Sequence, residues 1–171
     1  VVVSCPLCDG NRDEKFLIAG DANFGFTGQW SVVRCRDCGM LYTNPALPAN
    51  RIGTFYPPTY SAHKAIKATR HSQGRDPWDL LPDIGEKRLL DVGCGNGSYL
   101  LRKRAEGWRV IGVEPSRQAV EVARGHGLDV LEGAIPGVAL PQTEFDVITV
   151  LAALPCVPRP LEMLSELRRL L

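Results

Sequence analysis

Hydrophobic positions in the C-terminal half of the chain switch repeatedly between the spacing of a β-strand and that of an amphipathic helix. The apolar runs that predict strands are Leu89–Asp91, Trp108–Glu114, Leu128–Leu131 and Phe145–Leu151. The segments that predict helices are Tyr99–Glu106, the stretch from Ser116 to Gly125, and a last helix from about Pro160. Strands that alternate with helices in this way predict a parallel sheet with right-handed βαβ crossovers, which is an α/β fold.

The last two predicted helices each have a recognisable apolar face. In the helix that Ser116 caps, this face consists of Ala119, Val120, Val122 and Ala123. In the last helix, leucines recur at intervals of three and four residues, and the predicted apolar face consists of Leu161, Leu164, Leu167 and Leu171. We expect both faces to pack against the sheet.

A glycine-rich loop follows the first predicted strand. Gly93, Gly95 and Gly97 remove side chains where the backbone must turn sharply and a ligand approaches closely. A dinucleotide-binding fingerprint would place its third glycine at position 98, which is Ser98 here, and a P-loop would need a Gly-Lys-Ser/Thr sequence. The spacing disfavours both, while a glycine-rich turn in some other α/β protein stays open as the plain alternative.

Acidic residues end the first two predicted strands. Asp91 places a carboxylate at the carboxyl end of the first strand, where open α/β sheets bind their ligands. Glu114 ends the second strand, and one carboxylate there can accept hydrogen bonds from both hydroxyls of a ribose. Either acid alone would be a solvated strand end, but the two acids beside the glycine loop predict a site for a small-molecule cofactor.

Four cysteines near the N-terminus form two Cys-x-x-Cys pairs. Cys5 and Cys8 make the first pair and Cys35 and Cys38 the second, with 26 residues between the pairs. This spacing predicts a four-thiolate zinc site of the zinc-ribbon type, closed to water and therefore structural. Disulfides and a thioredoxin-like redox pair are the alternatives. We disfavour them because no signal peptide is visible and neither pair stands at the start of a helix.

Composition and net charge exclude only a few classes of function. The chain has 171 residues, 44% of them hydrophobic, which suits one compact domain with a small appendage. A formal net charge of +1 gives no electrostatic case for nucleic acid or an anionic membrane. Because no apolar run approaches the length of a membrane span, we expect a cytoplasmic protein.

Three regions are predicted along the chain. They are a zinc-ribbon-like module over 1–45, a linker with helical or irregular structure over 46–85, and a cofactor-binding domain over 86–171. Within the linker, His63–Arg75 carries four cations and no acid, so we interpret it as solvated; contact with a substrate phosphate is the alternative.

Several segments in a fixed order resemble one bacterial family. They are the first Cys-x-x-Cys pair, RCRDCGMLYTNP (Arg34–Pro45), FYPPTY (Phe55–Tyr60), the glycine loop, GVEPS and FDVITVL. Together they resemble class I S-adenosylmethionine-dependent methyltransferases with an N-terminal zinc-binding segment, among them enzymes that modify sugars and secondary metabolites. The resemblance covers essentially the whole chain. It implies a Rossmann-like sheet with its first four strands in the order 3-2-1-4, and methyl transfer to a small-molecule acceptor.

The resemblance also implies roles for individual residues. Asp91, Gly93, Gly95 and Gly97 would line the methionine and ribose parts of the cofactor, Glu114 would bind the ribose hydroxyls, and Pro115 would flank the adenine. The other residues expected to bind the cofactor are Cys94, Asn96, Ala134, Ile135 and Leu151. Structural Zn²⁺ would be held by Cys5, Cys8, Cys35 and Cys38.

Two positions depart from the family pattern. Gly133 and Ala134 stand where the family usually has an acid that meets the adenine amine, so adenine would rely on backbone groups and on apolar contact. Pro155 and Cys156 stand where related sequences often have Glu-His, so no catalytic residue is assigned. Methyl transfer would then depend mainly on holding the reactants in line.

Other functions stay open on the sequence alone. The chain starts without methionine and stops inside the last predicted helix, with four of seven expected strands, so we expect a truncated domain whose fourth strand can self-associate through its edge. The main alternative is a catalytically inactive domain that binds the cofactor or a partner. A nucleic-acid-binding zinc ribbon is disfavoured, since Arg34 and Arg36 are its only support.

Overall fold

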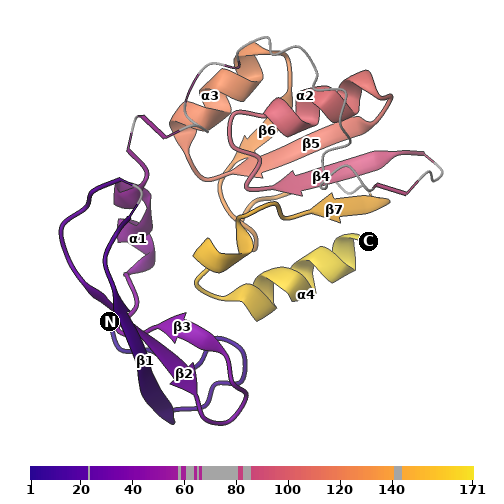
Figure 1. Cartoon of the computed structure of the whole chain (residues 1–171). Helices are drawn as coiled ribbons and strands as arrows, with labels where there is room; N and C mark the ends of the chain where they lie inside the picture. The colour runs from indigo at the N-terminus through magenta and orange to yellow at the C-terminus, as the bar shows by residue number, and fades with distance from the viewer. Residues whose placement is uncertain are drawn as a thin grey trace. The chain divides into compact units, whose positions relative to one another are not determined.

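The computed structural model describes residues 1–22, 24–57, 59–60, 64, 66, 81–82, 86–140 and 144–171 (Figure 1). They fall into two compact units. The N-terminal unit consists of Val1–Pro57 with Cys156–Glu162, and the C-terminal unit of Pro58–Pro155 with Met163–Leu171. Most of the basic stretch from 63 to 75 in the predicted linker lies outside the described residues. Within the described part, no helix is both long and apolar enough to cross a membrane.

A three-stranded antiparallel sheet forms the centre of the N-terminal unit. Its strands are β1 (Asp13–Ala19), β2 (Trp30–Cys35) and β3 (Leu41–Thr43), in the order β1-β2-β3. A short helix α1 (Ala49–Ile52) and the 3₁₀ turn η1 (Gly53–Phe55) follow. The buried core is small and consists of Cys5, Val33, Cys35 and Tyr42. Two of its four members are cysteines from the predicted zinc site, so this unit has little apolar burial of its own.

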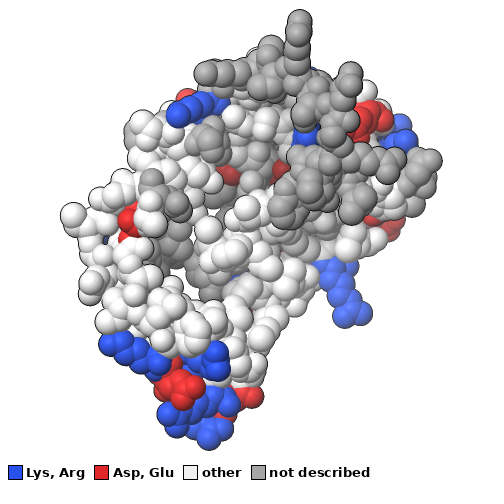
Figure 2. Space-filling model, viewed as in Figure 1, with Lys and Arg blue, Asp and Glu red and all other residues white. Residues whose placement is uncertain are grey.

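Much of the apolar surface of the N-terminal unit stays exposed. On β1, the side chains of Phe16, Leu17 and Ile18 are all more than two fifths exposed. Around them, Lys and Arg side chains mix with Asp and Glu at the β1–β2 end of the unit (Figure 2), where Arg12 pairs with Asp37 and Arg36 Nε lies 3.3 Å from Glu14 Oε2. Charges of both signs therefore lie close together at this end of the unit.

The C-terminal unit contains the predicted parallel sheet. Its strands are β4 (Arg88–Val92), β5 (Arg109–Glu114), β6 (Asp129–Glu132) and β7 (Val147–Thr149). They lie in the order β6-β5-β4-β7, and all three pairings are parallel. Counted within this sheet, the order is 3-2-1-4, so the predicted α/β topology is confirmed. The carboxyl ends of β4 and β5 meet at one edge, which brings Asp91 and Glu114 toward the same loop.

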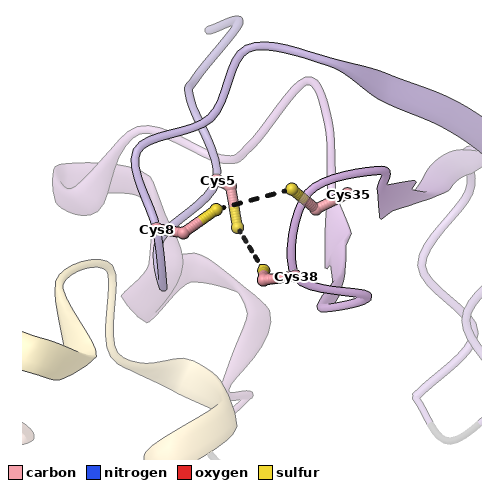
Figure 3. Close-up of side chains that lie close together, drawn as sticks. All are labelled: Cys5, Cys8, Cys35 and Cys38. Carbon is pink, nitrogen blue, oxygen red and sulfur yellow. Dashed lines mark hydrogen bonds between the residues drawn. The ribbon is translucent and has the colours of Figure 1, made fainter.

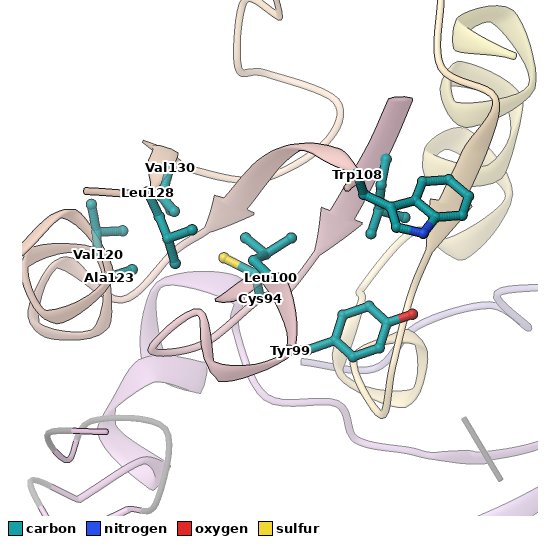
Figure 4. Packing of buried hydrophobic residues seen from close by; sticks show 9 residues of the cluster. Cys94, Tyr99, Leu100, Trp108, Val120, Ala123, Leu128 and Val130 are labelled. Atoms are coloured by element: carbon teal, nitrogen blue, oxygen red, sulfur yellow. The ribbon is translucent and has the colours of Figure 1, made fainter. Parts of the chain in front are cut away.

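Two helices cover the sheet on a common hydrophobic cluster (Figure 4). They are α2 (Ser98–Ala105), which packs on β5, and α3 (Arg117–Gly125), which packs on β5 and β6. As predicted, the Ser116 side chain caps α3 by accepting the Ala119 N–H. The buried members of the cluster are Leu89, Cys94, Tyr99, Leu100, Trp108, Val120, Ala123, Leu128 and Val130.

The last helix, α4 (Pro160–Leu170), buries a different face from the one predicted. Its buried residues are Met163, Leu167 and Leu170, of which only Leu167 was expected. The side chains of Leu161, Leu164 and Leu171 are instead 44%, 43% and 63% exposed. Both sets of residues recur at helical spacing and share Leu167, so packing against the rest of the unit selects the buried face.

β7 is shorter than the predicted run from Phe145 to Leu151. The N–H of Phe145 donates to the carbonyl of Leu170 at 2.8 Å, and that of Asp146 to the carbonyl of Arg88 at 3.0 Å. The Asp146 carboxylate also binds the Arg88 guanidinium. These bonds connect the residues before β7 to α4 and to the start of β4, and the pairing of β7 with β4 ends at Thr149.

Gly97→Ala is expected to lower the free energy of unfolding by at least about 2 kcal/mol. Gly97 has φ +80°, which costs a residue with a side chain about 1–2 kcal/mol. A Cβ there would also lie 2.3 Å from Leu128 Cδ1, so the core must shift. Urea unfolding followed by tryptophan fluorescence measures the difference.

Gly107→Ala is the matched control, because Gly107 has φ +90° but no atom within 4 Å of the Cβ position. Its loss of stability should reflect backbone strain alone. Equal losses in the two variants would contradict the close packing assigned to Gly97.

Candidate cofactor site and four-cysteine cluster

The glycine loop between β4 and α2 adopts a backbone conformation that side chains disfavour. Gly93, Gly95 and Gly97 all have positive φ, at +76°, +57° and +80°. At Gly93 a Cβ would lie 2.6 Å from the Cβ of Ala153, so there is no room for a side chain at this position. The alternating glycines thus allow both the turn and the close approach of the segment that follows β7.

Glu114 joins the glycine loop to the end of β5. Its Oε2 accepts the N–H of Gly95 at 2.9 Å, and its Oε1 accepts the N–H of Ser116 at 2.9 Å. The residue is only 9% exposed, so these two bonds replace water around the carboxylate. Each carboxylate oxygen keeps a second lone pair, which leaves acceptor capacity for ligand hydroxyls.

Asp91 lies beside this loop at the end of β4 and is 2% exposed. Its Oδ1 accepts the hydroxyl proton of Thr149 at 2.7 Å. Burial raises the pKa of Asp91 to about 7, the Thr149 hydrogen bond opposes the rise, and the negative charge of Glu114 adds to it. A nearby positive charge would stabilise the ionised form of this buried carboxyl group.

A pocket of about 390 Å³ opens over the glycine loop. It is lined by Asp91, Gly93, Cys94, Gly95, Asn96, Ser98, Tyr99 and Leu151. Six of these eight residues are among the predicted cofactor-binding residues. Ser98 and Tyr99 were not predicted. Their position in the first turn of α2, directly after the last glycine, is the sequence signal that could have identified them.

The other predicted cofactor-binding residues lie around this pocket without lining it. Glu114 contacts the loop through Gly95, and Gly97 turns its Cα toward Leu128 and Ala123. Ile135 is 5% exposed, whereas Pro115 and Ala134 lie at the surface. The structure therefore brings most of the residues expected at the methionine end together in one pocket and places the residues expected at the adenine in the turns after β5 and β6.

The four N-terminal cysteines converge (Figure 3). Their sulfur atoms all lie within 4.8 Å of one another, with 3.6 Å between Cys5 and Cys38 and between Cys8 and Cys35. All four are free thiols, so the disulfide alternative does not hold in this structure. Four thiolates at about 2.3 Å from one tetrahedral ion would be separated by about 3.8 Å, close to the observed spacing.

Backbone amides surround the sulfurs of this cluster. The N–H groups of Cys38 and Asp37 donate to the Cys35 sulfur and lower the pKa of Cys35 to about 7, against the opposing effect of burial. The amide N–H of Gly10 donates to Cys8 and that of Met40 donates to Cys38, but burial and neighbouring thiols raise the pKa of both cysteines above the ordinary thiol value. Such donors stabilise sulfur with negative charge, as a metal-bound thiolate has.

Comparison with known proteins finds similarity in the C-terminal part of the chain. Residues 90–171, which contain most of the parallel sheet, the glycine loop and both buried acids, match the sequence profile of a methyltransferase domain family. In strand order and in this match, the C-terminal part of the chain is similar to a methyltransferase domain.

The relatives found by sequence share only this part. A mitochondrial ubiquinone biosynthesis O-methyltransferase from Schizosaccharomyces pombe is 34% identical over 90 residues, covering 47% of this chain and 32% of the relative. The corresponding enzyme from Thiobacillus denitrificans is 34% identical over 99 residues, covering 54% and 43%. The chain thus spans well under half the length of these relatives.

A solved SAM-dependent methyltransferase from Thermotoga maritima is 33% identical, with a TM-score of 0.45 over 54% of this chain and 41% of that chain.

The stability of the protein should fall as pH rises through the range in which Asp91 titrates. The pKa of Asp91 rises on folding from 3.8 to about 7, so in this window the folded state binds more protons than the unfolded state. Raising the pH from about 4 to about 8 should cost up to about 4 kcal/mol, and Asp91→Asn should remove most of this dependence. Urea unfolding across the pH range measures it.

Asp129→Asn is the control, because Asp129 is an exposed acid at the start of β6. It should leave the pH dependence unchanged. If Asp91→Asn and Asp129→Asn give the same profile as wild type, Asp91 does not titrate as assigned.

Proposed function

We propose that the pocket over the glycine loop binds S-adenosylmethionine and that the chain takes part in methyl transfer to a small-molecule acceptor. The observation that carries this proposal is the convergence of two buried carboxylates, Asp91 and Glu114, on one glycine loop at the carboxyl edge of a parallel sheet. The methyltransferase domain match over 90–171 supports the same assignment.

The charge of the site favours a cationic cofactor over a phosphorylated one. In a dinucleotide or P-loop site, backbone N–H groups of the loop face phosphate oxygens. Here the Gly95 N–H is already bound to Glu114, and two carboxyl groups lie where a phosphate would be repelled. S-adenosylmethionine carries a sulfonium and an ammonium group, which both suit an acidic pocket.

Each predicted residue has a proposed part in binding. Asp91, Gly93, Cys94, Gly95 and Asn96 would hold the methionine end, where the ammonium group is attracted to Asp91. Glu114 would accept the ribose hydroxyls with its remaining lone pairs. The residues proposed to contact adenine are Pro115, Ala134 and Ile135, with Leu151 closing the apolar side of the pocket and Gly97 allowing α2 to pack.

The chain contributes to the reaction mainly through position. S-adenosylmethionine supplies a methyl group already activated by the sulfonium. The pocket residues fix its orientation and exclude water, which is the principal requirement of an in-line displacement. No catalytic base is assigned. The named ubiquinone O-methyltransferases act on a small molecule, which favours a small-molecule acceptor here.

We also propose that the four-cysteine cluster binds one structural Zn²⁺. Its sulfur spacing of 3.6 Å and its N–H···S donors match a four-thiolate site. Cys5 and Cys35 are buried in the small core of the N-terminal unit, so the metal would connect both Cys-x-x-Cys turns to that core. A closed site of this kind leaves no position for substrate or water.

Calorimetric titration should show binding of S-adenosylmethionine and no binding of NAD. Glu114→Gln should weaken the cofactor affinity at least about tenfold, because it loses charge-assisted hydrogen bonds to ribose. Glu121→Gln is the control, since Glu121 is an exposed acid on α3 paired only with Arg117 among the described residues. Lack of binding to wild-type protein at millimolar cofactor would overturn the proposal.

Metal analysis of the purified chain should find about one zinc per molecule. Cys5→Ser should lose it and destabilise the N-terminal unit, because the core then loses its metal ligand. Cys156→Ser is the matched control, as Cys156 is exposed and outside the cluster. Zinc retained by Cys5→Ser, or absent from wild type expressed with zinc, would contradict the four-thiolate site.

A further inference from the structure

Thr149 is the last residue of β7 and lies directly beside Asp91 in the sheet. The parallel pairing of β4 with β7 places Asp91 opposite Thr149. The Thr149 hydroxyl is 2.7 Å from Asp91 Oδ1 and 3.4 Å from the carbonyl oxygen of Leu90. Asp91 lines the pocket and Thr149 does not. Thr149 therefore reaches the pocket only through Asp91.

The two distances show where the single hydroxyl proton goes. A threonine hydroxyl donates one hydrogen bond, and the shorter contact to the carboxylate is the stronger one. A donor to an ionised carboxylate stabilises that form and also limits rotation of the group. Threonine and valine both suit a β-strand, so strand formation does not account for the hydroxyl group of Thr149. Its hydrogen bond to Asp91 does.

The other groups around Asp91 act in the opposite direction. Glu114, from β5, brings a second negative charge to the same edge, and Cys94 and Tyr99, from the loop and α2, contribute buried surface. Among the described residues, the Thr149 hydrogen bond is the one interaction that lowers the pKa of Asp91. Without it, burial and Glu114 would both favour the neutral acid.

We infer that Thr149 is a positioning residue for cofactor binding, which holds the Asp91 carboxylate at the pocket and favours its ionised form. The inference rests on the proposed function, since it assumes that a cation of S-adenosylmethionine is the partner of Asp91. Thr149 itself touches neither the cofactor nor the acceptor in this account.

The test is the pH dependence of cofactor affinity in Thr149→Val, Thr149→Ser and wild type, measured by calorimetry. Valine keeps the shape of threonine without the hydroxyl, and serine keeps the hydroxyl. In wild type, affinity should rise with pH around a midpoint of about 7 and reach a plateau above about pH 8, because the ionised acid binds the cation. Thr149→Val should move the midpoint up by about one pH unit and weaken binding about fivefold near pH 7.

At high pH the valine variant should approach wild-type affinity, and Thr149→Ser should restore the wild-type midpoint. A loss of affinity by the same factor at every pH would overturn the inference, because a purely structural role predicts that result. Circular dichroism of each variant establishes whether it is folded, and the serine variant tests the hydroxyl if the valine variant is not.

A ligand-free measurement separates this inference from the proposed function. Unfolding of Thr149→Val should lose stability over a wider pH range than wild type, because the pKa of Asp91 rises further. If wild type binds no S-adenosylmethionine, the proposed function fails. If wild type binds it and the pH profiles of wild type and Thr149→Val coincide, only the role of Thr149 fails.

Discussion

The burial of two carboxyl groups side by side constrains the whole C-terminal unit. Glu114 is held by the N–H groups of Gly95 and Ser116, so one side chain connects the turn after β4 with the turn after β5. Asp91, one strand away, is held by Thr149 of β7. The acids therefore fix the relation between three parallel strands at their carboxyl ends, and their burial without a cation is unfavourable. A cationic ligand would relieve that cost, which supports the cofactor proposed for this site.

The N-terminal unit depends on a different constraint. Its core holds only four buried hydrophobic residues, two of them cysteines, while Phe16, Leu17 and Ile18 stay exposed on β1. So small a core rarely stabilises a fold without a staple. The rings of Phe26 and Trp30 both pack on the ring of Phe55, and their centroids lie 5.0 Å and 5.8 Å from the Phe55 centroid. A metal ion bound by the four converging thiolates would hold the two Cys-x-x-Cys turns together and so stabilise this unit.

Sequence patterns predicted the fold better than they predicted the surfaces. The glycine spacing and the acids at Asp91 and Glu114 located the pocket, because both features belong to single segments of chain. The buried face of α4 was predicted wrongly, since its sequence offers two leucine-containing stripes and only packing selects between them. Tyr99 was also missed as a pocket residue, because an aromatic residue at this spacing fits a core position equally well.

The sequence by itself determined the succession of strands and helices in the C-terminal part, the turn that favours glycine, and the two cysteine pairs. These features are local: backbone conformation, hydrophobic periodicity and ligand spacing act over a few residues. The tertiary structure alone decided that Thr149, 58 positions from Asp91, donates to its carboxylate, and that the Gly95 N–H is bound to Glu114. Those contacts depend on strand pairing and on burial, which set the ionisation of a carboxyl group and leave no pattern in the neighbouring sequence.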